Sequence, residues 1–137
     1  MMKISVSQAK GRIEVTILRP HGDLDAASYT DLIAAAQEAR QAGASDILLD
    51  LAGTPYMSSS GLVALQSIAA LLRDEEPPDL EAGWDAIRAI KRGPEAGFQE
   101  HFKLLNPRPR VSHVLEMVGF TRFLEVHTDL EEAVASF

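Results

Sequence analysis

The stretch from residue 46 to residue 62 constrains the fold of this chain more than any other part of the sequence. Residues 47–51 are almost wholly apolar, and they are bounded by Asp46 before them and by Gly53 after them. Such a short run is typical of a strand that is buried on both faces of an α/β sheet. After the loop, apolar residues recur at helical spacing at Leu62, Leu65, Ala69 and Leu72. The stretch therefore predicts a strand, a loop and a helix.

Three consecutive serines, Ser58, Ser59 and Ser60, stand where that helix begins. At this place a hydroxyl can accept a hydrogen bond from a free backbone N–H, and the helix dipole favours an anion. Capping of the helix is one explanation for any one of them. Since one cap uses one serine, three in a row are more than the helix start demands.

The same stretch resembles the motif of the STAS domain, a module shared by anti-sigma factor antagonists and sulfate-transporter tails. The resemblance rests on the segments Asp50-Leu51-Ala52-Gly53, Tyr56-Met57 and Ser59-Ser60-Gly61-Leu62. In bacterial anti-sigma factor antagonists the motif usually runs Met-Asp-Ser-Ser/Thr-Gly-Leu, and the partner kinase phosphorylates the serine after the aspartate. That serine is Ser59 here, and Ser58 stands where the family usually has the aspartate.

The resemblance implies a protein-interaction switch whose partner is an anti-sigma factor serine kinase and whose phosphorylation site is Ser59. The residues that it implies in partner binding are Asp25, Met57, Ser58, Ser59, Ser60, Gly61 and Leu62. We expect Asp50 to lie at the carboxyl end of the central strand and to support the serine loop by accepting backbone N–H bonds. The chain has no phosphate-binding loop of the Gly-x-x-x-x-Gly-Lys-Ser/Thr type, so the phosphoryl donor is expected elsewhere.

A phosphate on Ser59 would act on the partner more than on the domain itself. It would add about −1.5 to −2 charges beside a partly positive helix end, which tolerates an anion. A partner surface fitted to a small neutral hydroxyl would instead have to desolvate a dianion. One residue can therefore switch binding off without unfolding the module.

Composition narrows the remaining function classes. A length of 137 residues with 46% hydrophobic content suits one domain over residues 1–137. The net charge of −7 argues against nucleic acid as a partner. The chain has no cysteine, and no stretch approaches the ~18 apolar residues of a membrane span or forms a signal peptide. We therefore expect a cytoplasmic protein without a membrane segment or cofactor, and self-association into a homodimer stays open.

The N-terminal part predicts a hairpin followed by a helix. Residues 4–6 and 12–18 alternate apolar with polar side chains, with the turn near residues 9–11. Residues 22–25 match a Gly-x-Leu-Asp segment of STAS domains, and Asp25 is placed to cap a helix over residues 26–41. His21, Asp23 and Asp25 alternate as metal ligands could, but no fourth ligand follows at a recognised spacing, so we expect no metal site.

A segment of about residues 75–99 is an insertion relative to a typical STAS domain. It holds an apolar stripe at helical spacing, which predicts an extra helix over residues 80–92: Leu80, Trp84, Ile87 and Ile90. This helix either covers an apolar strip of the same domain or provides an added partner or ligand contact.

The last part of the chain again resembles the C-terminal half of a STAS domain. Residues 101–105 predict a strand, and the stiff loop 106–110 leads into a helix that ends at Gly119. Residues 123–126 predict a short last strand. Thr128 and Glu131 predict a capping box for a final helix.

Together these patterns predict a single α/β domain of STAS type, with a mixed sheet of five or six strands, helices mainly on one face and an inserted helix. An enzyme is not expected, because the serine segment lacks the leading glycine of a nucleophile elbow and no spacing singles out a histidine as a base. Two other functions stay open. One is a STAS module that binds a small ligand such as a nucleotide or a lipid, and the other is a scaffold unit without phosphorylation.

Overall fold

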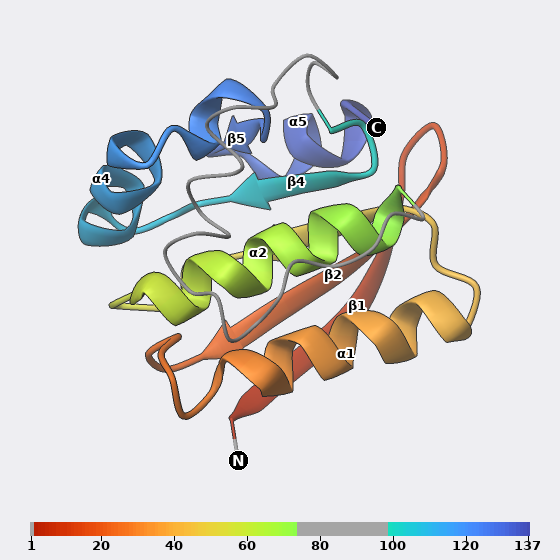
Figure 1. The fold of residues 1–137 in the computed structure, drawn as a ribbon. Helices are drawn as coiled ribbons and strands as arrows, with labels where there is room; N and C mark the ends of the chain where they lie inside the picture. The colour runs from red at the N-terminus through yellow and green to blue at the C-terminus, as the bar shows by residue number, and fades with distance from the viewer. Residues whose placement is uncertain (1, 74–98) are drawn as a thin grey trace.

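The computed structural model describes residues 2–73 and 99–137, and Figure 1 shows their fold. The predicted helix over residues 80–92 lies outside the described residues. The elements follow in the order β1 (Lys3–Lys10), β2 (Glu14–His21), α1 (Tyr29–Gln41), β3 (Ile47–Asp50), α2 (Ser59–Leu72), β4 (Phe102–Leu105), α4 (Pro109–Met117), the 3-10 helix η2 (Phe120–Arg122), β5 (Val126–His127) and α5 (Leu130–Ala135).

The strands form one mixed sheet of five strands in the order β1-β2-β3-β4-β5. β1 and β2 pair in antiparallel fashion, with Lys3 opposite His21 and Lys10 opposite Glu14. The pairs β2 with β3, β3 with β4, and β4 with β5 are all parallel. The carboxyl ends of β2, β3 and β4 therefore meet at one edge of the sheet, which we call the carboxyl edge. The predicted mixed sheet is confirmed.

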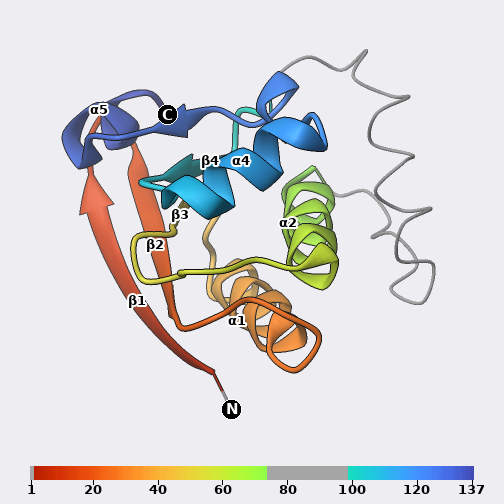
Figure 2. The ribbon, with the colours of Figure 1, turned by 90° about the vertical axis from the view of Figure 1, so that its left-hand side faces the viewer.

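Helices cover the two faces of the sheet unequally, as Figure 2 shows. The larger core lies between one face and α1, α2 and α4, and it includes Leu32, Leu65 and Leu115 from these helices. On the other face, α5 contributes Ala133 and Val134 to a smaller cluster with Val15, Ile17 and Leu48 of the strands. The prediction of helices mainly on one face is thus confirmed.

The helix α2 is the central packing element of the larger core. Nine of its fourteen residues are buried, and they lie on more than one side of the helix. A helix that is apolar nearly all round must lie inside a fold, and α2 packs against both α1 and β4. Even the hydroxyl of buried Ser67 is satisfied within the helix, by donating to the carbonyl of Val63 at 2.9 Å. A helix that is buried on several sides therefore starts at the serine segment.

The hairpin and the start of α1 differ from the predictions. The strands run to Lys10 and from Glu14, so the turn lies at residues 11–13, and Val6 is 60% exposed rather than half-covered. The first helix begins at Tyr29 instead of residue 26. The reason is local: the carboxylate of Asp25 accepts from the Ala27 N–H at 3.0 Å, which closes a turn ahead of the helix.

The last strand and the last helix also begin later than predicted. A left-handed Gly119 (φ 83°) leads into η2, so the chain pairs with β4 only at Val126–His127. The cap of α5 is Asp129, whose carboxylate accepts from the Glu131 N–H at 3.0 Å, and not Thr128. Within the described residues, no helix is long and apolar enough to cross a membrane.

Candidate functional site

Two loops meet at the carboxyl edge and hold the start of α2 between them. The Leu24 N–H donates to the carbonyl of Tyr56, and the Ser58 N–H donates to the carbonyl of Leu24, both at 2.9 Å. These bonds flank a parallel bridge between Leu24 and Met57, whose side chains are both buried. The predicted partner-binding residue Asp25 is thereby brought next to Met57 and the serines, although it lies far from them in sequence.

Gly61 allows α2 to approach the Leu24 loop closely. A Cβ atom at this position would lie 2.6 Å from Cγ of Met57 and 2.8 Å from the backbone carbonyl oxygen of Leu24. The second contact is with backbone that the bridge to Met57 holds in place. Gly61 and buried Leu62 therefore form the packed side of the helix start, and Ser59 and Ser60 are its more accessible residues.

The three serines occupy different positions at the helix start. Ser58 is the N-cap residue, with extended backbone (φ −90°, ψ 179°) and no side-chain capping bond. Its hydroxyl oxygen is buried without a hydrogen-bond partner. Ser59 and Ser60 are the first residues of α2 and are partly exposed. The first turn carries no acidic residue, so the positive end of the helix dipole is uncompensated there.

Asp50 lies at the carboxyl end of β3, as expected, and its side chain is 15% exposed. One carboxylate oxygen accepts from the Ala52 N–H at 3.0 Å. The other lies 3.8 Å from a guanidinium nitrogen of Arg19, a half-exposed side chain. Asp50 therefore holds the turn that leaves the strand, several residues before the serines.

Sequence reasoning missed one pair at this edge, Tyr56 and Arg110. The guanidinium carbon of Arg110 lies 5.5 Å from the centroid of the Tyr56 ring, within range of a cation–π interaction. Arg110 belongs to the first turn of α4, and Figure 1 shows α4 and α2 starting at the same edge of the sheet. The sheet topology could have indicated this pair. The two residues follow β3 and β4, and the segments that follow parallel strands meet at one edge of the sheet.

Three of the four histidines bond to groups outside the serine segment 58–60. His21 bonds with the Ser5 hydroxyl at 2.8 Å, His101 with Asp46 at 2.9 Å, and His127 with Glu125 at 3.2 Å. Within residues 2–73 and 99–137, no three His, Asp or Glu side chains are placed to hold a metal ion. The arrangement of His21, Asp23 and Asp25 as metal ligands therefore gains no support.

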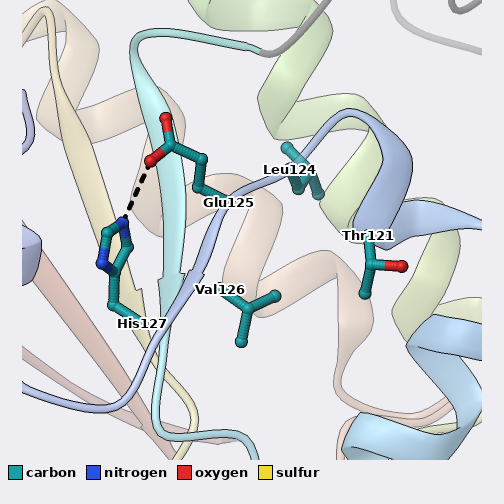
Figure 3. A pocket seen from close by; sticks show the side chains of 5 residues that line it. All are labelled: Thr121, Leu124, Glu125, Val126 and His127. Carbon is teal, nitrogen blue, oxygen red and sulfur yellow. Dashed lines mark hydrogen bonds and ion pairs between the residues drawn. The ribbon is translucent and has the colours of Figure 1, made fainter.

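A hollow of about 350 Å³ lies beside β5 and is lined by Thr121, Leu124, Glu125, Val126 and His127. Figure 3 shows Leu124, Val126 and Thr121 on one side of the chain, with the bonded pair of Glu125 and His127 on the other. None of its lining residues belongs to the serine segment or to the loops that hold it. Trp84, beside which a ligand pocket would have favoured small-molecule binding, lies outside the described residues.

Several solved structures with a similar fold carry the name of anti-sigma factor antagonists. A protein of that description from Mycobacterium paratuberculosis matches with a TM-score of 0.67 and 15% identity, over 99% of this chain and 93% of its own. A candidate antagonist from Thermotoga maritima matches with a TM-score of 0.63 and 18% identity, over 95% and 90%. The antagonist SpoIIAA, in its unphosphorylated form, matches with a TM-score of 0.57 and 22% identity, over 95% and 93%. At these identities the similarity shows a shared fold.

Comparison with curated proteins finds no match. The family model of the STAS domain matches residues 6–76, more than half of the chain. The match spans most of β1, then β2, α1, β3 and α2, and so includes the whole serine segment. It ends where the inserted segment was predicted to begin. The chain therefore belongs to the STAS domain family.

Proposed function

We propose that this protein is an anti-sigma factor antagonist that binds an anti-sigma factor with serine kinase activity and is released when Ser59 is phosphorylated. The observation that carries the proposal is the position of Ser59, a partly exposed residue that begins an otherwise largely buried helix. The names of the structural neighbours support the same role. SpoIIAA of Bacillus is also known in a phosphorylated form.

The switch follows from the chemistry of the helix start. The first turn of α2 has no acidic residue and no side-chain cap, so a phosphate there meets free N–H groups of the domain. A partner that covers Asp25, Met57 and residues 58–62 would have to bury that phosphate. The desolvation of a dianion costs far more than that of a hydroxyl, so binding is lost while the fold is kept.

In this role the chain itself carries out no catalysis, and the partner supplies both the ATP site and the phosphoryl transfer. The antagonist acts in the cytoplasm, where it competes with a sigma factor for the anti-sigma factor and so regulates transcription. The two serines beside Ser59 serve the helix start: Ser58 as its N-cap residue and Ser60 as the second residue of α2.

The test is an affinity measurement with each purified anti-sigma factor of the host. We expect one of them to bind the wild type and Ser59→Ala equally, and to bind Ser59→Asp weakly. Ser59→Asp should unfold within about 1 kcal/mol of the wild type, because an acid near a helix start is tolerated. Equal binding of the wild type and the Asp variant, or no binding by any anti-sigma factor, would contradict the proposal.

A further inference from the structure

We infer that Tyr56 and Arg110 form a docking contact for an acidic segment of the partner protein. This inference rests on the proposed function, because it concerns the same partner, but it adds a contact outside the phosphorylation motif. The contact joins the loop before α2 to the first turn of α4.

Geometry is the first observation. The guanidinium carbon of Arg110 lies 5.5 Å from the centroid of the Tyr56 ring. Both side chains remain accessible: Tyr56 is 39% exposed, and Arg110 is also exposed. An aromatic ring that covers one face of a guanidinium leaves the N–H donors along its edge free to bind another group.

The pair is held in place from both sides. The carbonyl of Tyr56 accepts from the Leu24 N–H, and the Leu24 carbonyl accepts from the Ser58 N–H, so the backbone around the ring is fixed. Arg110 follows Pro109, which stands in the first turn of α4 and restricts the backbone there. A contact whose backbone is already held in place loses less conformational entropy on binding.

The charge at this place is opposite to that of the whole protein. The chain has a net charge of −7, yet Arg108 and Arg110 flank Pro109 on an exposed helix start. In the part of the chain that the structure describes, neither arginine forms an ion pair with an acidic side chain. The two cations are therefore available to a partner.

The chemistry that fits this pair is a carboxylate. The edge of a guanidinium presents parallel N–H donors that match a carboxylate in bidentate fashion. Tyrosine and arginine are also the residues that most often dominate the binding energy of a protein interface. Since Tyr56 stands three residues before Ser59, an acidic segment bound here places the partner over the phosphorylation site.

The experiment compares affinities for the host anti-sigma factor that binds the wild type. The variants are Arg110→Gln, Tyr56→Leu and Tyr56→Phe, each with its thermal unfolding measured. The control is Arg12→Gln, which removes the same charge from the hairpin turn at the opposite end of β2. We expect Arg110→Gln and Tyr56→Leu to weaken binding by about 5- to 30-fold, as interface anchors do. Tyr56→Phe and Arg12→Gln should bind like the wild type.

Salt dependence gives an independent readout. The wild-type affinity should fall as the salt concentration rises, and Arg110→Gln should show a smaller fall than Arg12→Gln. If an anti-sigma factor binds and Arg110→Gln matches the wild type in affinity and in salt dependence, the docking contact is overturned and the proposed function stands. If no host anti-sigma factor binds the wild type, the proposed function fails, and the docking contact fails with it.

Discussion

At the scale of single residues, Ser58 departs most clearly from the family pattern. It holds the N-cap position with a backbone suited to capping, yet its hydroxyl is buried and bonds to nothing in the described structure. An aspartate there would place a carboxylate at the free N–H groups of the first turn and beside the hydroxyl of Ser59. Such a group can orient the hydroxyl for transfer.

We therefore predict that Ser58→Asp is phosphorylated faster than the wild type by the cognate kinase. A single-turnover time course with ATP measures the rate, and Ser60→Asp is the matched control because it adds the same charge two residues later. Equal rates for the wild type and Ser58→Asp would show that the neutral side chain of Ser58 does not slow phosphorylation.

Asp50 gives a second prediction at this scale. Its carboxylate accepts the Ala52 N–H, while its contact with half-exposed Arg19 is long and adds little. Asp50→Ala should lower the free energy of unfolding by about 0.5 to 1.5 kcal/mol, the usual net value of one hydrogen bond. Chemical denaturation measures this, with Arg19→Gln as a control expected to change stability less. Unchanged stability in Asp50→Ala would make the residue a solvated strand end.

At the scale of elements, the fit of α2 against the Leu24 loop depends on Gly61. Alanine is the better helix former by about 1 kcal/mol, but its Cβ would lie 2.8 Å from the Leu24 carbonyl oxygen. We predict that Gly61→Ala lowers the free energy of unfolding by about 1 to 3 kcal/mol, as overpacked sites do. Ser60→Ala, in the same turn, should stay within about 0.5 kcal/mol. A more stable Gly61→Ala would show that the loop can yield.

The attachment of α5 depends on a buried lysine. The ammonium of Lys103 donates to the carbonyl of Ser136 at 2.8 Å and to its hydroxyl at 3.1 Å, and it pairs with Glu125 at 3.1 Å. It also lies 4.8 Å from the centroid of the Phe137 ring. We predict that Lys103→Met loosens α5 first. Relative to the wild type, amide exchange at residues 130–135 should become faster by a larger factor than amide exchange in β3. Unchanged exchange would show that Ala133 and Val134 alone hold the helix.

The sequence predicted the elements that have a strong apolar pattern. The strand before the serines and the helix after them are mostly apolar, so their burial was predictable from the sequence. The observed β3 and α2 lie close to the predicted positions. Element starts were less predictable: residues 26–28 form a turn closed by Asp25, and competition between a turn and a helix is not visible in periodicity. Lys103 and the Tyr56–Arg110 pair were missed, because their partners are distant in sequence and only the sheet order brings them together.

At the scale of the whole molecule, the mixed sheet collects the proposed machinery at one edge. The parallel strands β2, β3 and β4 end there, so the Leu24 loop, the serines and the start of α4 become neighbours. The opposite face of the sheet carries α5, which packs on the smaller apolar cluster. A folded domain that presents the Ser59 hydroxyl at such an edge suits control of binding by phosphorylation of that one residue.

The measurement that tests this account most directly is release of the bound anti-sigma factor on addition of ATP and Mg²⁺. The complex is followed over time, and the phosphorylated position is mapped by mass spectrometry. We predict that the wild type dissociates as one phosphate appears on Ser59, while the Ser59→Ala complex stays intact under the same conditions. Phosphate on Ser58 or Ser60 instead, or release of Ser59→Ala at the wild-type rate, would contradict the assignment of Ser59 as the switch.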